Sequence, residues 1–268
     1  MQLKRRVALN GVELDQADTS IVIRSVEPAD GRENISAVSL AGGCGQRMTG
    51  RHRDTVDMIV RFAILIRKDN LAGRAAALEK ANEWAARAKN GAWLTVNYKT
   101  NRRLWVVLAQ APGEGSLWDY TKDFQITFRA YGVPYWQETE ATGTVTVAAG
   151  TSGTGTLAVP GSADTVADAV LTNESESTVN TCKVTADGNQ LMFSDLGLAA
   201  GESLVIDHEN DGLLRIRILD TNESYRSAMN KRTPASNDDL FCRTGNRSVG
   251  FTSEYSCSLT VSCKGRFL

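Results

Sequence analysis

A strict alternation of apolar and polar residues at positions 55–67 constrains the fold of this chain more than any other feature. The even positions are all apolar: Val56, Met58, Val60, Phe62, Ile64 and Ile66. The odd positions include Thr55, Asp57, Arg61 and Arg67. Side chains of a β-strand point alternately to its two faces, so this segment predicts a half-buried strand roughly 40 Å long. Such a strand requires a sheet that buries one of its faces.

Several shorter strands and one helix surround this strand. Asn10-Gly11 separates apolar residues 7–9 from residues 12–14 and favours a hairpin turn. Strands are also predicted at residues 21–23, 36–40, 93–98, 104–109 and 123–131. An alanine-rich stretch, residues 71–89, follows the N-cap candidate Asn70 and ends at Asn90-Gly91. We therefore predict that residues 1–137 form a mainly β, sandwich-like domain with a single helix at about residues 70–90.

The composition changes in the second half of the chain. Residues 138–156 are rich in Thr, Gly, Ala and Ser, which predicts a linker or a loosely paired edge strand. Residues 157–268 show no helical periodicity. About seven short apolar segments separated by Gly, Asn, Asp and Ser turns predict an antiparallel β-sandwich there.

The net charge of -1 conceals two halves of opposite sign. Residues 1–137 carry 20 Lys and Arg against 14 Asp and Glu, whereas residues 138–268 carry 10 against 17. The basic residues of the first half are scattered among acids and are not interleaved with aromatic residues, which argues against nucleic-acid binding. No apolar run approaches the ~20 residues of a membrane helix, and the N-terminal basic cluster lacks the apolar stretch of a secretory signal. We expect synthesis in the cytoplasm.

The cysteines and histidines do not suggest catalysis or metal binding. Cys44, Cys182, Cys242, Cys257 and Cys263 contain no C-x-x-C pair, and we interpret them as small apolar core residues, with Cys44 the most exposed. The two histidines, His52 and His208, each have charged neighbours and are predicted to lie in solvated turns. Because no acid-base constellation is present, we predict no enzymatic activity, no cofactor and no metal.

Two loops imitate ligand-binding motifs. Residues 42–52 contain the G-x-x-x-x-G spacing of a phosphate loop, but Arg51-His52 replaces the required Lys and Ser/Thr, so we interpret this segment as a flexible basic loop between strands. Residues 207–212 (Asp-His-Glu-Asn-Asp-Gly) resemble the start of a calcium loop, but Ile218 stands where a glutamate is needed. A hairpin turn is the simpler interpretation.

The five tryptophans all lie in the first half: Trp84, Trp93, Trp105, Trp118 and Trp136. Trp84 belongs to the apolar face of the predicted helix. Trp118 and Trp136 lie near turns, where they are either interface anchors or packing residues under a loop.

The order of these elements resembles the distal tail protein family of long-tailed, siphovirus-type bacteriophages. The resemblance rests on the Asn10-Gly11 hairpin, the strand around residues 57–62, the helix containing residues 78–84, and the closing block of residues 124–135. In the second half it rests on residues 201–207, residues 243–249 and the final Gly265-Arg266-Phe267-Leu268.

This resemblance implies a structural virion protein without catalytic residues. N-terminal domains of the family associate into a ring, a hexamer, at the end of the tail tube, and galectin-like C-terminal β-sandwiches project outward. The implied partners are the tail tube protein and the tail-tip or baseplate proteins. The alternative from the residues is a carbohydrate-binding adhesion module whose sandwich binds a host-surface glycan; an exposed aromatic cluster in the second half would favour it.

Overall fold

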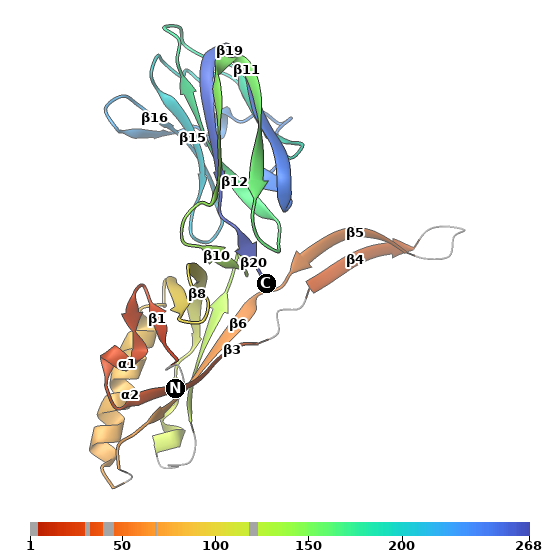
Figure 1. Ribbon diagram of the computed structural model, residues 1–268. Helices are drawn as coiled ribbons and strands as arrows, with labels where there is room; N and C mark the ends of the chain where they lie inside the picture. The colour runs from red at the N-terminus through yellow and green to blue at the C-terminus, as the bar shows by residue number, and fades with distance from the viewer. Residues whose placement is uncertain (1–4, 30–32, 40–45, 68, 118–122) are drawn as a thin grey trace. The chain divides into compact units, whose positions relative to one another are not determined.

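The chain consists of two compact units, residues 1–134 and residues 135–268, which are described separately. The structure, a computed structural model, describes residues 5–29, 33–39, 46–67, 69–117 and 123–268 (Figure 1). Both units consist mainly of antiparallel β-strands, as predicted, and the longer of the two α-helices belongs to unit 1.

Unit 1 contains an antiparallel sheet of seven strands. In spatial order they are β2 (Val12–Glu13), β1 (Val7–Leu9), β7 (Ala92–Val96), β8 (Arg102–Gln110), β9 (Phe124–Ala130), β6 (Val56–Ile64) and β3 (Ile21–Ala29). Asn10 and Gly11 have φ of 48° and 82°, so the predicted hairpin turn between β1 and β2 is confirmed. In β6, the even positions from Val56 to Ile64 are buried and the odd positions are half-buried, which confirms the predicted alternation over these residues. The predicted strand of residues 55–67 is too long, because β6 ends at Ile64 and Leu65 is exposed.

The helix α2 (Leu71–Ala86) covers the core of unit 1. Asn70 caps it, because its side-chain oxygen accepts a hydrogen bond from the Gly73 backbone N–H at 2.9 Å. Ala77, Leu78, Ala81 and Trp84 form much of its buried face. A second helix of four residues, α1 (Leu14–Ala17), was not predicted; it begins directly after β2. A 3₁₀ turn, η1 (Glu114–Leu117), precedes β9.

A separate two-stranded hairpin follows β3 (Figure 1). It consists of β4 (Glu33–Ser39) and β5 (Gln46–Arg53), which pair from Glu33↔Arg53 to Ser39↔Gln46. The prediction of a flexible loop over residues 42–52 is therefore wrong for residues 46–52. The extended backbone of those residues is held by pairing with β4, and residues 42–45 lie outside the described part.

Unit 2 is built around two long bent strands, β11 (Gly143–Val159) and β19 (Gly245–Cys263), which run side by side (Figure 1). One end of β19 pairs with β12 (Thr165–Asn173) and the other with β13 (Cys182–Ala186). The remaining strands are β10 (Trp136–Glu138), β14 (Asn189–Phe193), β15 (Ser203–His208), β16 (Leu214–Leu219), β17 (Tyr225–Ser227), β18 (Phe241–Cys242) and β20 (Arg266–Phe267), with a 3₁₀ turn, η2 (Met229–Lys231).

Residues 138–156 are not a linker, because β11 occupies most of them. The predicted alternative, an edge strand, agrees with the structure, but the strand is extensively rather than loosely paired. Fourteen residues of β11 have a partner on β19, with register shifts only between Val147, Gly150 and Ser152. Glycine makes this strand possible for a packing reason. A Cβ on Gly143 would lie 2.2 Å from the Ala158 carbonyl oxygen, and one on Gly153 would lie 2.4 Å from Cγ1 of Val147. Glycine at these positions allows the two halves of the strand to approach closely.

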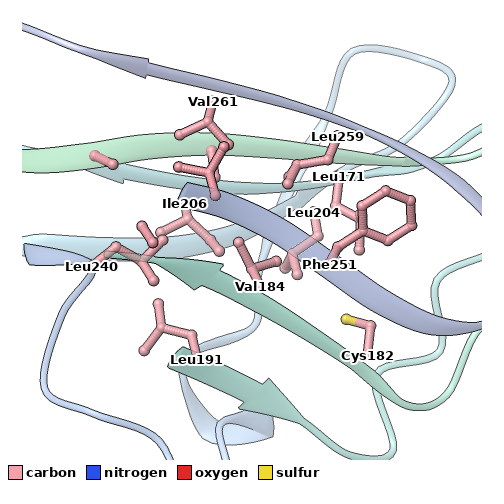
Figure 2. Packing of buried hydrophobic residues seen from close by; sticks show 14 of the residues in the cluster. Leu171, Cys182, Val184, Leu191, Leu204, Ile206, Leu240, Phe251, Leu259 and Val261 are labelled. Carbon is pink, nitrogen blue, oxygen red and sulfur yellow. The ribbon is translucent and has the colours of Figure 1, made fainter. Parts of the chain in front are cut away.

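The core of unit 2 lies where the sheets meet (Figure 2). Leu171, Val184, Leu204, Leu259 and Val261 are fully buried. Each comes from a strand whose outward neighbours are more exposed, as expected when one face of each sheet is covered. No helix of the described residues is long and apolar enough to span a membrane.

Candidate functional site

His208 is a buried residue held between two carboxylates. Nδ1 of His208 lies 2.7 Å from Oδ1 of Asp168, and Nε2 lies 2.9 Å from both carboxylate oxygens of Asp239. The side chain of His208 is 8 % exposed. Burial by itself lowers the pKa of His208, but hydrogen bonds and charge from Asp168 and Asp239 outweigh it and raise the pKa to about 9. The imidazole is therefore charged at neutral pH.

This position corrects the prediction that His208 lies in a solvated turn. His208 is the last residue of β15, and Asp168 comes from β12, whereas Asp239 belongs to the segment before β18. Both ring nitrogens already face carboxylates, so the ring has no free nitrogen for a metal or a substrate. The contact between His208 and Asp239 connects the segment before β18 to β15. The other histidine, His52, is in β5, and its side chain lies outside the described features.

The calcium-like segment of residues 207–212 is a turn between β15 and β16, as predicted. The Glu209 N–H donates to the Leu213 carbonyl at 2.9 Å, and Gly212 has φ of 88°. Its first acid is already paired: the Asp207 carboxylate accepts hydrogen bonds from Arg215 at 3.0 Å and Arg217 at 2.7 Å. Within the described residues, no group of three or more His, Cys, Asp or Glu side chains is arranged to hold a metal ion.

We expect calcium to leave the stability of the protein unchanged. A cation present at a hundred times its Kd would stabilise the fold by ~2.7 kcal/mol, which shifts a melting temperature by several degrees. Differential scanning calorimetry with excess CaCl₂ and with EDTA should give the same melting temperature. A rise with CaCl₂ that Asp211→Asn abolishes would show that residues 207–212 bind calcium.

Four cysteines pack in the core of unit 2, as predicted. Cys182, Cys242, Cys257 and Cys263 are buried free thiols. Burial raises the pKa of Cys182 and of Cys242 to about 12 and that of Cys263 to about 11. Thiols with such pKa values are poor nucleophiles at neutral pH. Cys44 lies outside the described residues.

The tryptophans differ in their surroundings. Trp84 and Trp136 are 2 % and 5 % exposed, so Trp136 is a packing residue in β10, whereas Trp118 lies outside the described residues. Trp93 and Trp105 are half-buried partners on β7 and β8, with ring centroids 5.1 Å apart. The Arg103 guanidinium lies 3.9 Å from the centroid of the Trp93 ring.

Arg103 is the unusual member of this aromatic face. Among the described residues its Nε is buried without a hydrogen-bond partner, and burial lowers its pKa with no carboxylate of those residues opposing the shift. Elsewhere in the sheet, Arg61 pairs with Glu27 at 2.8 Å, and Arg129 pairs with Asp57 at 2.5 Å. The period-2 alternation places Trp93 on the sheet face opposite buried Leu94. This face was not predicted from the sequence, although the alternation of Arg103 and Trp105 along β8 was visible there.

A hollow of about 480 Å³ lies on the helix side of unit 1. Its lining residues are Val12, Gln16, Ala17, Lys80, Glu83, Trp84 and Arg87. Lys80 is paired with Asp18 at 3.3 Å, and the Trp84 indole N–H donates to the Val12 carbonyl at 2.7 Å. The lining combines opposite charges on flexible side chains, and no convergent acid-base pair or nucleophile marks it as a catalytic pocket.

The exposed aromatic residues of unit 2 do not form a platform for sugar rings. Tyr225, Phe241 and Tyr255 are 53 %, 49 % and 43 % exposed, and they belong to three different strands. In the described part of the chain, no ring contact joins any two of them, and the Tyr225 ring is already covered by Arg217 at 4.1 Å. The observation that would favour a carbohydrate-binding module is therefore missing from these residues.

Comparison with solved structures identifies a class of proteins with this fold. One solved protein with this fold is a hub protein of a phage adsorption apparatus. The chain superposes on the SPP1 Dit protein (gp 19.1), described as a paradigm of the hub adsorption apparatus in phages that infect Gram-positive bacteria, with a TM-score of 0.67 and 13 % identity. The match covers 98 % of this chain and 99 % of the Dit chain.

Chains of the activated phage P2 baseplate are more distant. The form with Ca and the form with Sr each match with a TM-score of 0.49 and 8 % identity, over 97 % and 96 % of this chain and 98 % and 97 % of theirs. No family model matches the sequence, and no curated protein matches it. The resemblance to distal tail proteins is confirmed at the level of the fold, which this chain shares with SPP1 Dit across both units.

Proposed function

We propose that this protein is a structural hub of a bacteriophage tail, made in the cytoplasm of the host bacterium and carried in the virion. The observation that supports this most is the likeness to SPP1 Dit over 98 % of this chain and 99 % of that chain. Both units and their order are thus shared with a hub protein. Hub proteins act by assembly, so no catalytic group or cofactor is required.

In this proposal, unit 1 forms a ring, a hexamer, that joins the tail tube protein to the tail-tip or baseplate proteins. Two observations support unit 1 as the part that assembles. Residues 1–137 carry the excess of basic residues. The half-buried Trp93, Trp105 and Arg103 combine the residue types that dominate interface energies, and Arg103 lacks a carboxylate partner among the described residues of unit 1.

Electron microscopy of the purified full-length protein tests this proposal directly. We expect ring-shaped particles, because a head-to-tail contact that closes on itself generates a ring. Arg103→Glu should disperse the rings, since it places a negative charge where the proposed contact requires a positive one. Higher salt should weaken the assembly without unfolding either unit, because interfacial charge pairs are screened.

The matched control is Arg67→Glu, which reverses an exposed arginine in the segment after β6. It should leave the rings intact. Single particles of monomer size at high protein concentration would contradict the ring, and rings that persist in Arg103→Glu would contradict this face as the contact.

A further inference from the structure

β11 is an edge strand without the features that normally protect such strands. It is 17 residues long, and in the described part of the chain it pairs only with β19. Its sequence, GTVTVAAGTSGTGTLAV, contains no charged residue and no proline. Edge strands expose unpaired backbone N–H and C=O groups, and natural proteins usually block them with charges, proline, short length or a covering segment.

The other edge strands of the described residues are all blocked in one of these ways. β3 contains Pro28 and charged Glu27, and its Val26 carbonyl accepts a hydrogen bond from the Tyr98 hydroxyl at 3.2 Å. β17 has three residues, one of them Arg226. β2, β18 and β20 have two residues each. The isolated strands β4 and β5 contain Glu33, Arg47, Arg51 and Arg53.

β14 is covered by its own chain. The Thr233 N–H donates to the Met192 carbonyl at 2.8 Å, and the Asn237 N–H donates to the Gln190 carbonyl at 2.8 Å. Asn237 also accepts a hydrogen bond from the Gln190 N–H through its side chain at 2.7 Å. Against this pattern, the long uncharged edge of β11 is an exception within the same molecule.

The second half of β11, residues 152–159, is a straight and well-fixed part of this edge. Its pairing with β19 is uninterrupted from Ser152↔Thr252 to Val159↔Gly245. Leu157 and Val159 are buried, whereas Ser152, Thr154, Thr156 and Ala158 are exposed. Eight residues span roughly 27 Å, which is longer than an average strand. The edge is therefore rigid and long enough to accept another strand.

We propose that residues 152–158 form a docking edge for the same segment of a second copy of this chain, paired antiparallel about a twofold axis at Gly155. In this register Thr154 lies opposite Thr156 of the second copy and close to that copy's Thr154 on the same face, so a charge at this position would repel itself. The exposed residues are all Ser, Thr or Ala, which makes this edge compatible with itself. An acidic or basic partner would find no opposite charge on the strand. This contact belongs to unit 2 and goes beyond the proposed ring.

Charge variants of Thr154 in the full-length protein test this contact by light scattering. Thr154 is exposed, so Lys or Glu at this position should not disturb the core. The wild-type particle mass should be twice that of Thr154→Lys, and Thr154→Glu should give the same halved mass. Mixing the two variants should restore the wild-type mass, because lysine on one copy then faces glutamate on the other.

The twofold ratio separates this proposal from the ring. If the protein also forms the ring, Thr154→Lys should lower the particle mass from that of two rings to that of one ring. If the ring does not form, the mass should fall from that of a dimer to that of a monomer. Equal masses for wild type and Thr154→Lys would overturn the docking edge, as would a mixture of the Lys and Glu variants that stays at the halved mass.

Thr221→Lys provides the matched control, since Thr221 is exposed in the turn between β16 and β17. It should leave the mass unchanged, and a halved mass in this variant would attribute the effect to net charge and overturn the proposal. Hydrogen exchange gives a second readout. The amides of residues 152–159 that bond to β19 should stay protected throughout. The outward-facing amides of this segment should lose protection on dilution in the wild type, and they should be unprotected at every concentration in Thr154→Lys. Intermolecular pairing would be contradicted if protection were the same at all protein concentrations and in Thr154→Lys.

Discussion

Replacing His208 by glutamine is expected to make the stability of unit 2 nearly independent of pH between pH 6.5 and pH 9. In the wild type, the free energy of unfolding should fall over this range. The pKa of His208 is about 9 in the folded chain against 6.5 for a free imidazole. A raised pKa means that the folded state binds the proton more tightly. Its contribution to stability is therefore complete below pH 6.5 and disappears as the pH rises to 9, by up to about 3 kcal/mol.

The glutamine variant should be less stable than the wild type at pH 6 and nearly insensitive to pH across this window. Without the imidazolium, the buried carboxylate of Asp239 and the neighbouring Asp168 have no cation between them, and loss of one partner of such a cluster costs about 3–5 kcal/mol. The free energy of unfolding, from urea titrations followed by circular dichroism at several pH values, measures both effects.

Glu209→Gln is the matched control, because Glu209 directly follows His208 and its exposed side chain pairs with Arg215 at 3.4 Å. This variant should keep the alkaline slope of the wild type. The titration should include a reducing agent and stop at pH 9, since the buried thiols have raised pKa values and destabilise the fold only above the ordinary pKa of 9.0. A slope that persists in His208→Gln would show that other groups cause it.

Local patterns in the sequence were sufficient for the elements whose residues repeat with a fixed period. The alternation of β6, the helix α2 and the Asn10-Gly11 turn all depend on neighbours along the chain. The length and pairing of β11 could not be predicted from local patterns, for a physical reason. Its Gly and Thr residues suggest chain flexibility, but the strand is fixed by pairing with β19, about 100 residues away, and by the close approach of Gly143 to Ala158.

The same distinction explains which parts of the candidate sites could be predicted. The turn at residues 207–212 was recognised from its own residues. The burial of His208 was not, because Asp168 and Asp239 lie 40 and 31 residues away in the sequence. Adjacent Asp207 and Glu209 suggested solvent, although alternation in a strand directs neighbours to opposite faces. An exposed edge such as that of β11 depends entirely on which strands pair, and no local pattern contains that information.

Trp84→Ala is expected to destabilise unit 1 by about 3–5 kcal/mol, because it removes a large buried ring and leaves a cavity. Trp84 is 2 % exposed, its ring lies edge-on to Phe128 at a centroid distance of 5.8 Å, and its N–H bonds the Val12 carbonyl. Trp84→Phe should lose less stability, since it retains much of the apolar contact, while exposed Glu83→Ala should change stability by less than about 0.5 kcal/mol.

Hydrogen exchange shows which unit is destabilised by Trp84→Ala: peptides from β6 and β9 should lose protection, while those from β12 and β19 should keep it. Equal loss in both units would show that they unfold together, and no loss in either would mean that Trp84 does not hold α2 to the sheet.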